Sequence, residues 1–109
     1  MKELINLLHK GEKELEGYTF DVSTFNPVYM YVHVRLYGVL LDEMSIAKVD
    51  EANNLKHDDP KKGKYRVRFF SDSFVDADAN KVFQMLTAYI KQYHYLYIYK
   101  VNKVKQETI

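Results

Sequence analysis

The stretch VYMYVHVRLY, residues 28–37, decides the fold class of this chain. Every second residue in it is apolar: Val28, Met30, Val32, Val34 and Leu36. Alternation with a period of two, in a run rich in β-branched and aromatic residues, predicts a strand with one face in the core. Gly38 is expected to weaken or end this strand.

Weaker strand patterns lie on both sides of this stretch. Residues 18–23 alternate in the same way, and Asn26-Pro27 indicates the turn between the two runs. Residues 65–70 predict a further strand, and a last strand is expected over residues 95–101. Residues 39–52 fit either the return arm of a hairpin, which we favour, or a helix.

Two segments show helical periodicity. Residues 2–16 carry leucines on one stripe, and a second helix is expected to follow a turn at residues 71–76 and to run to about Tyr93. The polar residues 50–64 predict a loop, and the tail over residues 103–109 is expected to fray.

These elements predict an α+β fold. We expect a small two-layer domain over residues 1–102, with a mostly antiparallel sheet of four to five strands. An N-terminal helix precedes the sheet, and a C-terminal helix is inserted before the last strand. That strand–helix–strand unit, over residues 65–101, would allow one parallel or skipped pairing.

Composition narrows the possible classes of function. The 109 residues carry a net charge of +1 and contain no cysteine, which excludes disulfides, thiolate zinc sites and cysteine nucleophiles. The absence of cysteine favours a reducing compartment, so we expect a cytoplasmic protein, and no apolar run is long enough for a membrane span. Residues with AT-rich codons are abundant, as in accessory proteins of phages and mobile elements.

The strands predict one aromatic and arginine-rich sheet face. If all strands share a sheet, the face opposite the core carries six of the ten tyrosines and all three arginines. The candidate binding residues are Tyr29, Tyr31, His33, Arg35, Tyr37, Arg66, Arg68, Phe70, Tyr95, Tyr97 and Tyr99. Soluble monomers rarely leave an amphipathic area of this size bare.

Three explanations for this face stay open. The first helix could cover it through its leucines. A protein partner, including a second copy of the chain, could bind it, because tyrosine and arginine are enriched at interface hot spots. Single-stranded nucleic acid could stack on it, although the near-neutral charge and the order of elements do not favour that explanation.

Other motifs are better explained by structure than by chemistry. Residues 76–80, DADAN, resemble the opening of a calcium loop, but Lys81 and Thr87 stand where that loop needs glycine and glutamate. Helix capping accounts for them. The four histidines lack metal-ligand spacing, and no phosphate-binding loop motif occurs. We therefore expect no metal, no cofactor and no enzymatic activity.

The sequence thus predicts a small non-enzymatic interaction protein. It would bind a protein partner, or itself as a homodimer, through the sheet face or an exposed strand edge. A regulator or inhibitor from a phage or mobile element fits the size and composition. The alternative is a single-stranded nucleic-acid-binding module that uses the same face.

Overall fold

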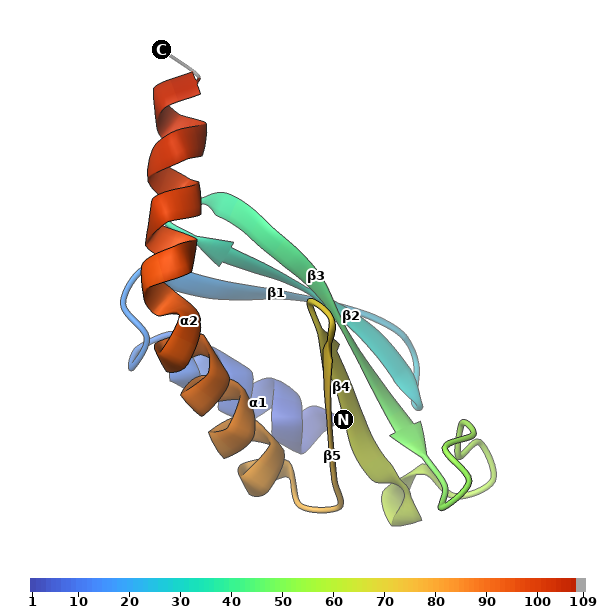
Figure 1. The fold of residues 1–109 in the computed structure, drawn as a ribbon. Coiled ribbons are helices and arrows are strands. Elements are labelled where there is room, and N and C mark those ends of the chain that lie inside the picture. The colour runs from blue at the N-terminus through green and yellow to red at the C-terminus, as the bar shows by residue number, and fades with distance from the viewer. Residues whose placement is uncertain (108–109) are drawn as a thin grey trace.

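The computed structural model describes residues 1–107 and places a helix before and after a five-stranded sheet (Figure 1). The elements are α1 (Lys2–Gly11), β1 (Tyr18–Asn26), β2 (Tyr29–Leu36), β3 (Val39–Val49), a 3₁₀ turn (Pro60–Lys62), β4 (Lys64–Phe69), β5 (Asp72–Asp76) and α2 (Ala79–Glu107). The α+β class and the antiparallel sheet predicted from the alternation are confirmed.

The sheet is a simple meander in the order β1-β2-β3-β4-β5. Each strand pairs with its neighbour in the sequence, and all four pairings are antiparallel. The ambiguous residues 39–52 supply β3, the return arm of a hairpin with β2. The parallel or skipped pairing allowed for residues 65–101 does not form, because the segment after β5 is helical.

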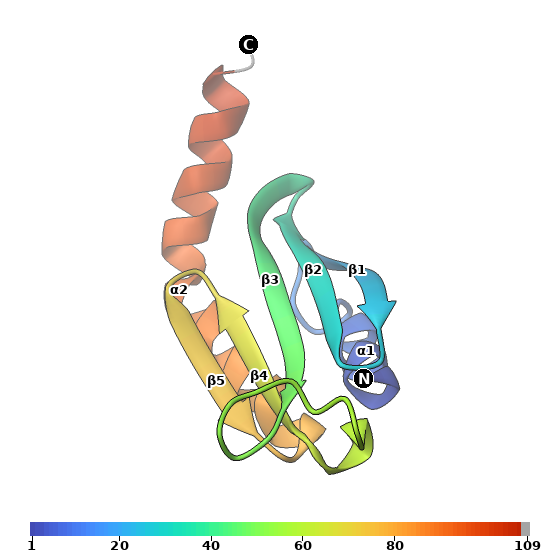
Figure 2. The same cartoon turned by 90° about the vertical axis from the view of Figure 1, so that its right-hand side faces the viewer.

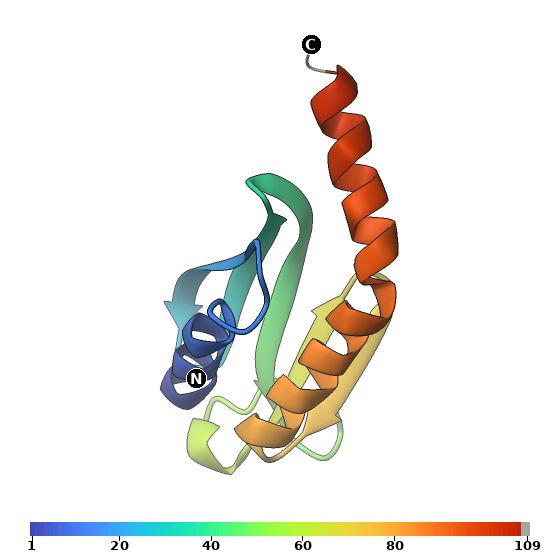
Figure 3. The same cartoon turned by 90° about the vertical axis from the view of Figure 1, so that its left-hand side faces the viewer.

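Both helices cover the same face of the sheet. In Figure 2 the sheet lies in front of α1 and α2, and in Figure 3, from the opposite side, the helices lie in front of the sheet. The core forms between the helices and the sheet. There, Leu4 and Leu8 of α1 and Leu86 and Ile90 of α2 are fully buried against strand residues. Burial of each such side chain contributes about 1.5–3 kcal/mol to folding.

The strand predicted over residues 95–101 is wrong, because this segment continues α2. The sequence contains no glycine or proline after Gly63 that could end the helix near Tyr93. Helical geometry buries Tyr97 and Val101, four residues apart, whereas Tyr95 and Tyr99 remain exposed. A helix therefore gives these residues the apolar contacts that the predicted strand was expected to provide.

The turn predicted at residues 71–76 is also wrong, because residues 72–76 form β5. This strand pairs with β4 after a tight turn in which Phe70 adopts a positive φ of 56°. The helix begins only at Ala79. Asp78 caps it, since its carboxylate accepts a hydrogen bond of 2.9 Å from the amide of Asn80. The helix capping predicted for residues 76–80 is thus confirmed at Asp78.

The two helices differ from their predicted lengths for physical reasons. α1 ends at Gly11, where a Cβ atom would lie 2.6 Å from Cζ of Phe83, so the glycine permits close contact with α2. α2 extends beyond the sheet (Figure 1) and includes residues 103–107 of the predicted tail, whereas residues 108 and 109 lie outside the described residues. Within residues 1–107, no helix combines the length and hydropathy needed to cross a membrane.

Candidate functional site

One face of the sheet carries neither helix in the described part of the chain (Figure 2). Pairing across the strands defines which side chains share it. Tyr29 of β2 lies opposite Ala47 of β3, which lies opposite Arg66 of β4. In the next row, Tyr31 lies opposite Ser45, and Ser45 lies opposite Arg68. A row of tyrosines and a row of arginines are therefore separated by small residues.

Six of the eleven predicted binding residues lie together on this uncovered face, which we call the open-face cluster. They are Tyr29, Tyr31, His33, Arg35, Arg66 and Arg68. Strict alternation places them there, because the residues between them on β2 and β4, such as Val32, Val34 and Val67, are fully buried in the core.

The two tyrosines of the open-face cluster contact each other. The rings of Tyr29 and Tyr31 meet edge to face, with centroids 5.0 Å apart. The neighbouring phenol of Tyr29 raises the pKa of Tyr31, with a smaller contribution from the Glu43 carboxylate. The Tyr31 phenol therefore stays protonated at neutral pH.

The two arginines beside them are held differently. Arg66 donates from Nη1 to the carbonyl and side-chain oxygens of Asn53, at 3.3 and 3.1 Å, and its Nε is buried without an acceptor among the described residues. Burial and the nearby Arg68 guanidinium lower the pKa of Arg66. Arg68 itself is exposed. The loop after β3 thus fixes one guanidinium, while the other faces solvent.

The rest of the open-face cluster is paired with carboxylates. Nε2 of His33 lies 2.9 Å from the Glu43 carboxylate, and Nε of Arg35 donates to Asp21 at 3.1 Å. These exposed pairs contribute little to stability. The uncovered face therefore carries carboxylates as well as arginines.

The other five predicted binding residues lie elsewhere. Tyr37 follows β2 with a positive φ of 48°, packs on Gly17 and lies under the ammonium of Lys105. Phe70 stacks on Tyr97 of α2, with centroids 5.3 Å apart. Because Tyr37 and Phe70 lie in turns, they do not follow the alternation that places the strand residues on the uncovered face.

Tyr95, Tyr97 and Tyr99 were predicted for the sheet face, and that prediction is wrong because they belong to α2. Tyr97 is buried, whereas Tyr95 and Tyr99 form an exposed patch with Leu96, which we call the helix patch. The helix patch lies on a different element from the open-face cluster.

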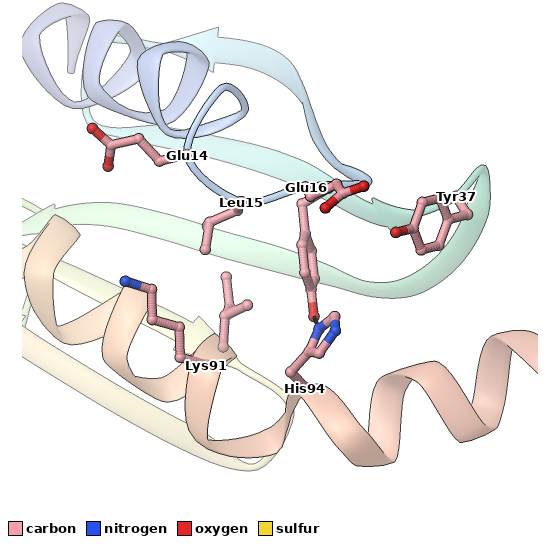
Figure 4. A pocket seen from close by; sticks show the side chains of 8 residues that line it. Glu14, Leu15, Glu16, Tyr37, Lys91 and His94 are labelled. Carbon is pink, nitrogen blue, oxygen red and sulfur yellow. Dashed lines mark hydrogen bonds between the residues drawn. The ribbon is translucent and has the colours of Figure 1, made fainter.

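A separate pocket of about 270 Å³ lies between the start of β1, the β2–β3 turn and α2 (Figure 4). Inside it, the Tyr18 hydroxyl lies 2.8 Å from Nδ1 of His94. Burial, with a smaller effect of Tyr37, raises the pKa of Tyr18 to about 12. The phenol therefore stays neutral near pH 7 and forms a hydrogen bond with His94. This bond fixes α2 against β1.

The sequence predictions did not include this pair. The sequence holds one indication of it, since His94 follows the buried Ile90 by four residues and so extends the apolar face of α2. Within residues 1–107, no group of three or more histidine, aspartate or glutamate side chains is arranged to hold a metal ion.

Comparison with known proteins adds no identification. No family model, no curated protein and no solved structure matches this chain significantly.

Proposed function

We propose that this chain is a small non-enzymatic interaction protein that binds a protein partner through the open-face cluster. The observation that supports the proposal is a sheet face that neither helix covers in residues 1–107 and that carries paired tyrosines beside two arginines. Tyrosine and arginine bury much area on binding and still offer polar ends, which explains their enrichment at interface hot spots.

The charges on this face favour a protein partner over nucleic acid. Two carboxylates lie on it: Asp21 pairs with Arg35, and Glu43 lies 2.9 Å from Nε2 of His33. Surfaces that follow a phosphate backbone carry a clear excess of basic residues, because each phosphate contact needs a cation. A surface of mixed charge with half-buried tyrosines is more typical of protein interfaces.

The face is a better site than the free edge of β1. The amide of Phe20 donates to the Glu12 carboxylate at 2.7 Å, and the amide of Tyr18 donates to the carbonyl of Leu15 at 3.0 Å. These bonds occupy donors that an added strand would need. We therefore assign binding to side chains of the open-face cluster.

The proposal extends to the role and the location of the protein. A regulator or inhibitor that acts in the cytoplasm, of the kind found in phages and mobile elements, agrees with the small size and the absence of cysteine. Binding to a second copy of the chain is included, and the solution mass distinguishes it from binding to another protein.

Affinity capture with two matched double variants tests the proposal. Tyr31→Ser with Arg68→Ser alters the open-face cluster, and Tyr95→Ser with Tyr99→Ser alters the helix patch. Arg68, Tyr95 and Tyr99 are exposed, so their substitution should change stability by no more than about 0.5 kcal/mol. Tyr31 is half-buried beside Tyr29, so urea unfolding checks that the open-face variant is folded. We expect one protein to be captured by the wild type and by the helix-patch variant, and to be lost by the open-face variant.

Light scattering on the same three proteins tests the homodimer. If the partner is a second copy, the wild type and the helix-patch variant should have twice the mass of one chain. Only the open-face variant should then have the mass of a single chain. Three outcomes would contradict the proposal. They are capture that depends on the helix patch, capture of nucleic acid alone, and a monomer that captures nothing.

A further inference from the structure

Lys48 is the one buried charged side chain among the described residues, with 5% of its surface exposed. It lies on the helix-covered face of β3, in phase with the fully buried Met44 and Ile46. Its neighbour across the sheet is Tyr65 of β4, and the Lys48 ammonium lies 3.8 Å from the centre of that ring. A lysine therefore occupies the end of a row of core side chains.

The Lys48 ammonium has three N–H donors, and within residues 1–107 none of them bonds to an acceptor. A cation–π contact offsets only part of the cost of removing an ammonium from water. Burial lowers the pKa of Lys48, and the Glu3 carboxylate opposes this shift in part. The ammonium of this largely buried side chain thus makes no hydrogen bond within the described residues, and Glu3 is the carboxylate that acts on its pKa.

The Lys48 side chain lines a pocket of about 580 Å³, between the start of α1, the β1–β2 turn and the 3₁₀ turn. The lining residues are Met1, Lys2, Glu3, Pro27, Lys48, Pro60, Lys61 and Tyr65. Three lysines face a single carboxylate here, so the pocket attracts anions. Its volume falls in the range of pockets that hold small organic ligands.

We propose that this pocket binds a small molecule that carries a phosphate ester, with Lys48 as the buried anchor of the oxyanion. Lysine binds phosphate as a point charge, and a dianion interacts with three ammonium groups more favourably than a monoanionic carboxylate does. Tyr65, Pro27 and Pro60 offer apolar surface to the organic part of the ligand. The pocket lies on the helix-covered side of the sheet, so this site is separate from the open-face cluster.

Inorganic phosphate is a sufficient probe of the oxyanion site. Nuclear magnetic resonance of protein labelled with ¹⁵N at lysine Nζ follows the Lys48 ammonium directly, with sodium chloride of equal ionic strength as the reference. We expect the Lys48 resonance to shift and to saturate with phosphate, and acetate to bind more weakly. A bound anion also stabilises the ammonium, so the pKa of Lys48 should rise with phosphate present.

Three variants make the test specific. Lys48→Met keeps most of the length of the side chain and removes its charge, which a buried position tolerates. Phosphate affinity, measured by calorimetry, should fall about ten- to a hundredfold, as expected for the loss of a charged hydrogen bond. Lys61→Met should weaken binding by a smaller factor, and the exposed Lys103→Met on α2 should leave it unchanged.

The proposal is wrong if phosphate moves the Lys48 resonance no more than chloride does. Equal phosphate affinity in the wild type and in Lys48→Met would also overturn it. If Lys48→Met fails to fold, the resonance of the wild-type Lys48 and the affinity of Lys61→Met still decide the question.

Discussion

The hydroxyl of Tyr18 and Nδ1 of His94 lie 2.8 Å apart, which joins the first strand to the last helix across 76 positions of sequence. This bond lies on the side of the sheet that both helices cover. It helps to fix α2 there, and α1 contacts α2 through Gly11 and Phe83. The other side of the sheet is left to the open-face cluster.

Tyr18→Phe should destabilise the protein. The substitution keeps the ring but leaves Nδ1 of His94 without its partner in a partly buried position, which costs about 1–2 kcal/mol. Urea unfolding followed by circular dichroism measures the loss. Tyr99→Phe is the matched control, since 70% of Tyr99 is exposed. An equal stability of both variants would show that the Tyr18–His94 bond contributes nothing.

Stability should fall in alkaline solution. Burial raises the pKa of Tyr18 and Tyr89 to about 12, from an ordinary value of 10.0. Between these values the unfolded chain releases phenolic protons that the folded chain keeps, so the free energy of unfolding decreases as pH rises from 10 towards 12. Urea unfolding at several pH values, with phenolate absorbance of the folded state, checks this. A constant stability from pH 9 to about 11.5 would contradict the burial of these phenols.

Val101→Ala and Tyr99→Ala test the helical register of the end of α2. Val101 is 2% exposed and belongs to the core, so its truncation should cost about 1–3 kcal/mol. Tyr99 is exposed, and alanine favours a helix, so its truncation should be close to neutral. In a strand, residues 99 and 101 would share one face. Similar losses in both variants, measured by urea unfolding, would therefore favour the strand.

Gly17→Ala should be more harmful than Gly38→Ala. Both glycines have positive φ, 85° and 81°, where alanine costs about 1–2 kcal/mol. A Cβ atom at position 17 would also lie 2.7 Å from the Tyr37 ring, whereas no atom lies within 4 Å of one at position 38. Thermal unfolding should give a lower melting temperature for Gly17→Ala. The reverse order would contradict the close contact with Tyr37.

The fold could be predicted from sequence where local patterns agree with long-range contacts. Residues 28–37 alternate strictly between a turn and a glycine, and residues 29–36 of this stretch form β2. Residues 95–101 mix tyrosines with Leu96, Ile98 and Val101, a pattern that fits a strand as well as a helix. The helical form is stabilised by distant contacts such as the stacking of Phe70 on Tyr97 and the bond from Lys100 to the carbonyl of Leu41. Such contacts have no local signature.

The candidate site could be predicted only in part, because it too depends on contacts between residues far apart in the sequence. Alternation placed the side chains of β2 and β4 on one face, and pairing in the structure brings them together. The face on which α1 packs depends on its contact with α2, which no short sequence window contains. Lys48 was visible in phase with apolar neighbours on β3, but its burial depends on Tyr65 and on the start of α1.

A photo-crosslinking amino acid in place of Tyr31 tests the open-face cluster most directly. It reacts only with molecules that touch this face, and the same amino acid in place of Tyr99 gives the matched control on the helix patch. We expect a defined protein adduct from position 31 and none from position 99, with mass spectrometry distinguishing a foreign protein from a second copy of the chain. Adducts from position 99 alone, nucleic-acid adducts at position 31, or no adduct at position 31 would contradict recognition through the uncovered sheet face.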